Sequence, residues 1–176
     1  MKKIILFATA IMMVSCGFMQ NSTSNTSSNQ TSTASTQKTT QSSNAANSAG
    51  QGAGNALQAL YAQYKADGKY DYTNLQNAMN TISLLSSCQG LKENYKNTTY
   101  LKDFGKGMIA TSLGLVNQNN VQTVTNSLVD MVKNNENVQA ATTQTQNAAN
   151  TTAGYLNTAS QYAGSISNLL SLFGNK

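Results

Sequence analysis

Apolar side chains recur every three or four residues through the last two thirds of the chain, a spacing that predicts amphipathic helices. The first such segment, residues 55–67, carries Leu57, Leu60, Tyr61 and Tyr64 on one face, and Gly68 follows as a stop signal. The second begins after Thr73 and Gln76, which have the spacing of a capping box. Its apolar stripe runs steadily through Leu75, Ala78, Met79, Ile82, Leu85, Cys88 and Leu91.

A third apolar segment starts near Thr99 and is interrupted by glycines. Gly105 and Gly107 lie inside it, and each glycine costs about 1 kcal/mol relative to alanine in a helix interior. The sequence therefore predicts a helix that is kinked or that begins only after Gly107. A polar break at residues 117–120 precedes a fourth helical face, formed by Val121, Val124, Leu128, Met131 and Val132.

The last apolar stripe spans residues 135–173 without losing register, and Gly174 follows it. Its members are Val138, Ala141, Thr145, Ala148, Thr152, Tyr155, Ala159, Tyr162, Ile166, Leu169 and Phe173. One long helix fits this pattern, and so do two helices with a break near residues 150–154. Because no segment shows a convincing period-two pattern, we expect an all-α fold, an antiparallel bundle of four or five helices.

The segment before these helices is polar and of low complexity. Residues 20–49 consist almost entirely of Ser, Thr, Asn, Gln and Ala, with Lys38 as the one charge, and Gly50, Gly52 and Gly54 follow. Such a composition offers no large apolar side chain whose burial would offset the entropy of ordering. We therefore predict a disordered tether over residues 16–54 and a helical domain over residues 55–176.

The first sixteen residues have the three parts of an export signal. Lys2 and Lys3 precede an apolar run of eleven residues, 4–14, and Ser15 and Cys16 follow it. A membrane-spanning helix needs about 20 apolar residues, so this run is too short to serve as a span.

The stretch Met13-Val14-Ser15-Cys16 resembles the lipobox of bacterial lipoproteins, with Met in place of the usual Leu. The resemblance covers residues 1–16 only. It implies removal of residues 1–15 and a diacylglycerol on Cys16, usually with a further acyl chain such as palmitate on the new amine. Two or three acyl chains, at about 0.8 kcal/mol per buried methylene, would hold the protein stably to a membrane.

The same family rules bear on the destination of the protein. Gly17 follows Cys16, so the Asp that retains lipoproteins in an inner membrane is missing, and so is an acid-rich stretch that sends some to the cell surface. The resemblance implies a place in the cell envelope, anchored in the outer membrane and facing the periplasm. The composition of the chain, which is rich in Asn and lacks Arg, is similar to that of small lipoproteins of low-GC bacteria, including gut Bacteroidota.

The composition argues against most catalytic and nucleic-acid-binding functions. The chain has no His, only 10% charged residues, and a net charge of +5 that two signal-peptide lysines inflate. Arg, the usual bidentate reader of phosphate and guanine, is absent. The acids are scattered; Asp67 and Asp71 lie close together, but in a turn that Lys65 and Lys69 flank. We expect no metal, no cofactor, no nucleic-acid partner and no enzymatic activity.

Cys88 and the tyrosines are the remaining candidates. Cys88 lies between Leu85 and Leu91, so we expect a buried small hydrophobe in preference to a nucleophile or a disulfide partner. Aromatic residues gather between residues 61 and 100, and a sugar- or partner-binding surface made of Tyr70, Tyr72, Tyr95 and Tyr100 is one interpretation. The alternative is that Tyr61 and Tyr64 belong to the core and the others cap loops.

These patterns favour a non-catalytic, membrane-anchored envelope lipoprotein that acts structurally or binds another envelope protein. The alternative is a carrier that encloses a lipid or another apolar ligand between its amphipathic helices.

Overall fold

The structure, a computed structural model, describes residues 34–133 and 152–174, with side chains from Ser43 onward. Within these two ranges it consists of helices and turns, with no strand, and the predicted all-α fold is confirmed. The helices are α1 (Ala34–Asp67), α2 (Leu75–Asn94), α3 (Thr98–Thr111), α4 (Val121–Lys133), α6 (Thr152–Gln161) and α7 (Ala163–Ser171). None of them is both long and apolar enough to cross a bilayer.

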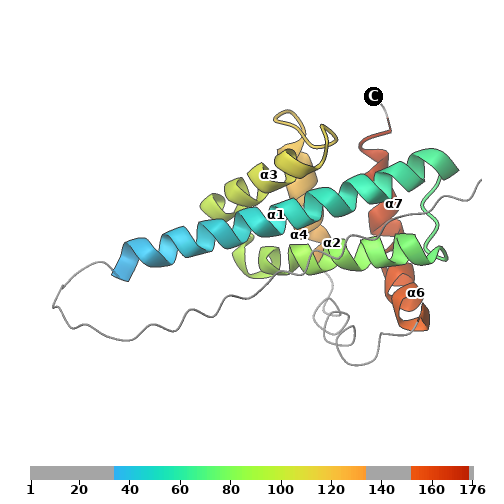
Figure 1. Ribbon diagram of the computed structural model, residues 1–176, viewed down its shortest axis with the longest axis horizontal. Helices are drawn as coiled ribbons and strands as arrows, with labels where there is room; N and C mark the ends of the chain where they lie inside the picture. Colours follow the sequence, from blue (N-terminus) through green and yellow to red (C-terminus); the bar gives the residue numbers. More distant parts are fainter. Residues whose placement is uncertain (1–33, 134–151, 175–176) are drawn as a thin grey trace, which may run out of the picture. The chain divides into compact units, whose positions relative to one another are not determined.

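The helices α1 and α2 form an antiparallel hairpin (Figure 1). As predicted, α1 ends just before Gly68, which has a φ of +70° that glycine adopts without strain. The predicted capping box is wrong, because Thr73 donates its hydroxyl to Asp71 (2.6 Å). Asn74 caps α2 instead, and its side-chain oxygen accepts from the backbone N–H of Gln76 at 2.9 Å.

The largest correction concerns the start of the folded part. The helix α1 begins at Ala34, so residues 34–54 are helical and the predicted boundary at residue 55 is wrong. Ala46 and Ala53 are fully buried there. Residues 16–33, the rest of the predicted tether, lie outside the described residues. The polar segment therefore contributes to the core through small side chains, which let another helix approach closely.

That other helix is α3, which packs along the middle of α1, between Ser43 and Gly54 (Figure 1). A Cβ atom added at Gly50 would overlap the carbonyl oxygen of Phe104, and one added at Gly107 would overlap the carbonyl oxygen of Asn47. The prediction that the helix begins only after Gly107 is wrong, because α3 runs without interruption from Thr98 to Thr111. The glycines that weaken α3 as an isolated helix permit its contact with α1.

The remaining helices complete the core, with α4 and α6 packing mainly against α2. The predicted fourth helix is confirmed as α4, which buries Val124, Leu128, Met131 and Val132. Within the described residues, the last stripe divides at Tyr162, between α6 and α7. The predicted break near residues 150–154 falls partly outside the described residues, because α6 is described only from Thr152 onward. Its positions from Ala159 to Phe173 are buried as predicted, whereas Val138, Ala141, Thr145 and Ala148 lie outside the described residues.

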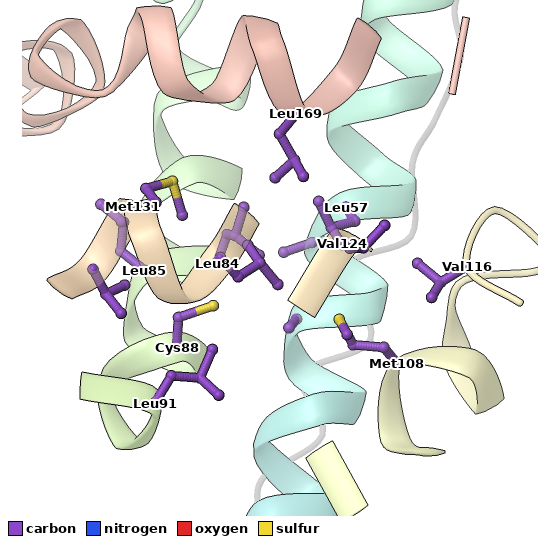
Figure 2. Packing of buried hydrophobic residues seen from close by; sticks show 14 of the residues in the cluster. Leu57, Leu84, Leu85, Cys88, Leu91, Met108, Val116, Val124, Met131 and Leu169 are labelled. Carbon is purple, nitrogen blue, oxygen red and sulfur yellow. The ribbon is translucent and has the colours of Figure 1, made fainter. Parts of the chain in front are cut away.

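One hydrophobic cluster joins all of these helices except α6. Figure 2 shows Leu57 of α1, Leu84 of α2, Val124 of α4 and Leu169 of α7 pointing into the same region. All four side chains are at most 3% exposed. The cluster includes residues from Ala46 of α1 to Phe173, directly after α7. The helix α1 therefore belongs to the folded part of the chain.

Candidate functional site

The structure does not bring the four predicted tyrosines together. Tyr72 lies in the turn before α2 and Tyr95 directly after it, so the 20 residues of α2, about 30 Å of helix, separate them. Tyr100 is only 8% exposed, and its hydroxyl rests against Gly90, where a Cβ atom would overlap it. A single binding surface made of these four side chains is therefore ruled out by geometry.

Three of the four tyrosines hold the fold together. Tyr70 is half-buried and shares a 2.6 Å hydrogen bond with the hydroxyl of Thr81. Burial raises the pKa of both Tyr70 and Tyr100. The ring of Tyr95 receives the ammonium groups of Lys96 and Lys133, 5.4 Å and 4.8 Å from its centroid, and thereby ties the ends of α2 and α4 together.

Tyr72 differs from the others because it is 42% exposed, and it precedes two exposed apolar side chains of α2. Leu75 and Met79 are 41% and 43% exposed and lie one helical turn apart on the same face. We call Tyr72, Leu75 and Met79 the apolar ridge. The predicted buried stripe of α2 is wrong at Leu75 and Met79, whereas its members Ala78, Leu85, Cys88 and Leu91 are buried as predicted. The buried face also includes Thr81 and Leu84, which the stripe left out.

Tyr61 and Tyr64 follow the alternative interpretation, because both pack against the hydrophobic core. Tyr61 is half-buried, stacks on Tyr64 with ring centroids 6.3 Å apart, and donates its hydroxyl to the carbonyl oxygen of Phe173 at 3.1 Å. Tyr162 is 1% exposed, and its buried hydroxyl has no hydrogen-bond partner within the described ranges. Burial raises the pKa of this hydroxyl.

The most constrained carboxylate is Asp103, which the sequence analysis did not single out. It accepts a 2.6 Å hydrogen bond from Ser43 of α1 and forms a 2.9 Å ion pair with Lys106 of α3. The hydrogen bond from Ser43, followed by the one from Lys106, lowers the pKa of Asp103. The carboxylate is thus engaged by Ser43 of α1 and by Lys106 of its own helix, and the bond to Ser43 joins α1 to α3.

Cys88 and Asp71 are also engaged within the fold, by burial and by hydrogen bonds respectively. Cys88 is a free thiol with no exposed surface, as predicted, and burial raises its pKa (Figure 2). Asp71 accepts from both the hydroxyl and the N–H of Thr73, and the hydroxyl bond is the main reason why its pKa is lowered. In residues 34–133 and 152–174, no three His, Cys, Asp or Glu side chains gather as a metal site would need. Cys16 lies outside the described residues.

An apolar concavity lies between α3 and α4, and we call it the α3–α4 groove. It has a volume of about 320 Å³. Leu101, Gly105, Ile109 and Val121 supply its apolar surface, and its polar lining consists of Thr98, Lys102, Lys106, Gln118, Gln122 and Thr125. A Cβ atom added at Gly105 would come within 2.9 Å of Val121 Cγ2, so the glycine keeps the two helices close beneath the groove.

A second hollow, between α4 and α7, has a more polar lining. It measures about 470 Å³ and combines Ser127, Asp130, Ser165 and Asn168 with Met131, Leu169 and Leu172. Its one carboxylate, Asp130, has no second acid or cation beside it in the lining. This arrangement is suited neither to acid–base chemistry nor to tight cation binding.

Comparison of the chain with models of protein families, with curated proteins and with solved structures gives no match.

Proposed function

We propose that this chain is a non-catalytic lipoprotein of the cell envelope, held to the outer membrane by lipid on Cys16 and facing the periplasm. Its helical domain acts as an interaction module for another envelope protein. The export signal and the lipobox resemblance of residues 1–16 support the anchor. The reactive side chains support a binding role, because Asp103, Cys88 and Tyr70 are each used in packing or in hydrogen bonds within the fold.

The observation that carries the interaction module is the apolar ridge. Three large apolar side chains, each more than 40% exposed, occur together at the start of α2. Leu75 and Met79 share one face of α2, and Tyr72 precedes them in the turn before the helix. Single exposed apolar residues are common on protein surfaces, whereas neighbouring ones are typical of a binding surface. Tyr72 also brings a polar hydroxyl to the ridge, as the tyrosines of protein interfaces commonly do.

The test is site-specific photo-crosslinking in the native cell. A photoreactive amino acid at Leu75 or Met79 should give a defined adduct with one envelope protein. The matched control is Gln89, an exposed position on the C-terminal half of the same helix, where no such adduct should form. The same adduct pattern at Gln89, or no adduct from the ridge positions, would contradict the proposed module.

A second candidate function, a carrier for an apolar ligand, is favoured by the α3–α4 groove. Its volume of about 320 Å³ falls at the lower end of the range of roughly 300–1,000 Å³ typical of small-molecule sites. Its surface combines apolar side chains with a few polar groups at the edge, which is the usual composition of such sites.

A further inference from the structure

The charge around the α3–α4 groove narrows the class of ligand that it would take. Lys102 and Lys106 are the only charged residues in its lining, and no acid lines it. Lys106 already pairs with Asp103, at 2.9 Å. Lys102 is exposed and forms no ion pair within the part of the chain that the structure describes.

The orientation of Asp103 preserves this charge at the groove. Asp103 lies next to Lys102 in sequence, but its carboxylate is held by Ser43 of α1, on the side of α3 that packs against the hairpin. The side chain of Asp103 is only 12% exposed and is not part of the groove lining. An anionic group above the groove would therefore meet Lys102 without competition from this acid.

The lining of the groove extends along α3. Its α3 side runs from Thr98, in the polar part of the lining, to Ile109, which is about 16 Å at the helical rise. Leu101, Gly105 and Ile109 follow one another along this side at four-residue spacing, and Val121 faces them from α4. A groove of this length, with a volume of only about 320 Å³, has room for one alkyl chain.

We propose that the α3–α4 groove binds a single-chain anionic amphiphile, a fatty acid or a lipid with one acyl chain and an acidic headgroup. The alkyl chain lies over Gly105 between Ile109 and Val121, and the anionic headgroup pairs with Lys102. This inference rests on the second candidate function, the carrier, and names its ligand class.

The test uses the full chain carrying Cys16→Ser, so that no acyl group of its own competes for the groove. Calorimetric titration with dodecanoate should show binding of one molecule. Gln122→Trp, which places a large ring in the lining from an exposed position of α4, should weaken binding at least tenfold. Thr123→Trp, at the neighbouring exposed position outside the lining, should leave the affinity unchanged.

Charge reversal tests the headgroup contact. Lys102→Glu should weaken dodecanoate binding about fivefold, since an exposed ion pair contributes up to about 1 kcal/mol. Lys65→Glu removes an exposed lysine of α1 that does not line the groove and should have no effect. Dodecyltrimethylammonium, which has the same chain with a cationic head, should bind more weakly than dodecanoate.

Each failure has a distinct meaning. Equal binding of the anionic and the cationic probe would overturn the assignment of an acidic headgroup but leave the carrier function standing. No binding of either probe would overturn the carrier as well. Binding of an acidic amphipathic peptide in the groove, blocked by Gln122→Trp and without binding of dodecanoate, would show that the occupant is a protein. None of these results bears on the lipid anchor at Cys16.

Discussion

At the scale of single residues, the contact between α1 and α3 depends on three glycines. Gly50 and Gly54 of α1 face the backbone of α3, and Gly107 of α3 faces the backbone of α1. Each of these positions lies close to backbone atoms of the other helix, which cannot move aside as a flexible side chain can. The helices approach so closely only because no Cβ atom stands between them.

We expect Gly107→Ala to lower the free energy of unfolding by about 3 kcal/mol, because its methyl group would overlap the carbonyl oxygen of Asn47 and force the helices apart. Urea unfolding monitored by circular dichroism measures this change. Gly164→Ala in α7 is the matched control, since a Cβ atom there meets nothing within 4 Å. Its stability should be equal to or slightly above that of the parent. Equal stability of the two variants would disprove the close crossing.

The hydrogen bond between Ser43 and Asp103 should make stability depend on pH. Because the pKa of Asp103 is lowered in the folded state, the ionised carboxylate stabilises the fold above its ordinary pKa of about 3.9. This stabilisation is lost as the pH falls through the folded-state pKa. Ser43→Ala removes the main cause of the lowered pKa.

We expect Ser43→Ala to cost about 1.5–3 kcal/mol at neutral pH, the contribution typical of a hydrogen bond to a charged group. The cost should shrink as the pH is lowered below about 4. Urea unfolding at several pH values tests this expectation. Ser83→Ala, which removes an exposed hydroxyl bonded within α2, should have little effect at any pH. A cost for Ser43→Ala that stays constant with pH would contradict the role given to Asp103.

The sequence predicted some of these residue-scale features and missed others. The burial of Cys88 follows from its place between apolar residues at helical spacing, and the structure confirms it. The role of Asp103 was missed, because its partner Ser43 is 60 residues away and lies in a segment that looked unstructured. Local patterns carry no information about such a pairing.

At the scale of secondary-structure elements, α1 shows where the reading of hydrophobic periodicity failed. Its first 21 residues, 34–54, contain no large apolar side chain. The buried positions Ala46, Gly50, Ala53, Leu57 and Leu60 nevertheless follow one another at intervals of three or four residues. A search for small residues at helical spacing, in place of large apolar ones, would have found this face.

The helical start of α1 can be tested at Ala46, which has no exposed surface. Ala46→Asp would bury a charge and should cost about 3 kcal/mol or more. Asn44→Asp adds the same charge at an exposed position of the same helix and should be tolerated. Thermal unfolding of both variants measures the difference. If residues 34–54 were a solvated tether, neither substitution would matter, and equal melting temperatures would contradict the helix.

The other elements were largely readable. The end of α1, the existence of α2 and the whole of α4 follow from apolar spacing and from glycine and asparagine at their ends. The errors came from context: α3 tolerates its glycines because α1 packs on them, and Asn74 caps α2 while Thr73 is engaged by Asp71. The division at Tyr162 leaves the apolar stripe in register on both sides, so the pattern gave no sign of it.

At the scale of the whole molecule, the described helices form a folded part that starts at least 20 residues earlier than the sequence suggested. At most residues 16–33 are left for the predicted tether. The all-α class was predictable because every apolar segment has helical spacing. The candidate sites could not be predicted from the sequence. The apolar ridge and the α3–α4 groove depend on which helix faces are covered by neighbouring helices, and local spacing does not show this.

The central claim is that lipid on Cys16 holds this helical module to a membrane. The most direct measurement is the intact mass of the protein extracted from the membranes of its native cells, with fragmentation of its N-terminus. The account predicts a chain that begins at residue 16 and carries a diacylglycerol, usually with an additional acyl chain. A mature chain that starts at any other residue, or one whose Cys16 carries no lipid, would contradict it.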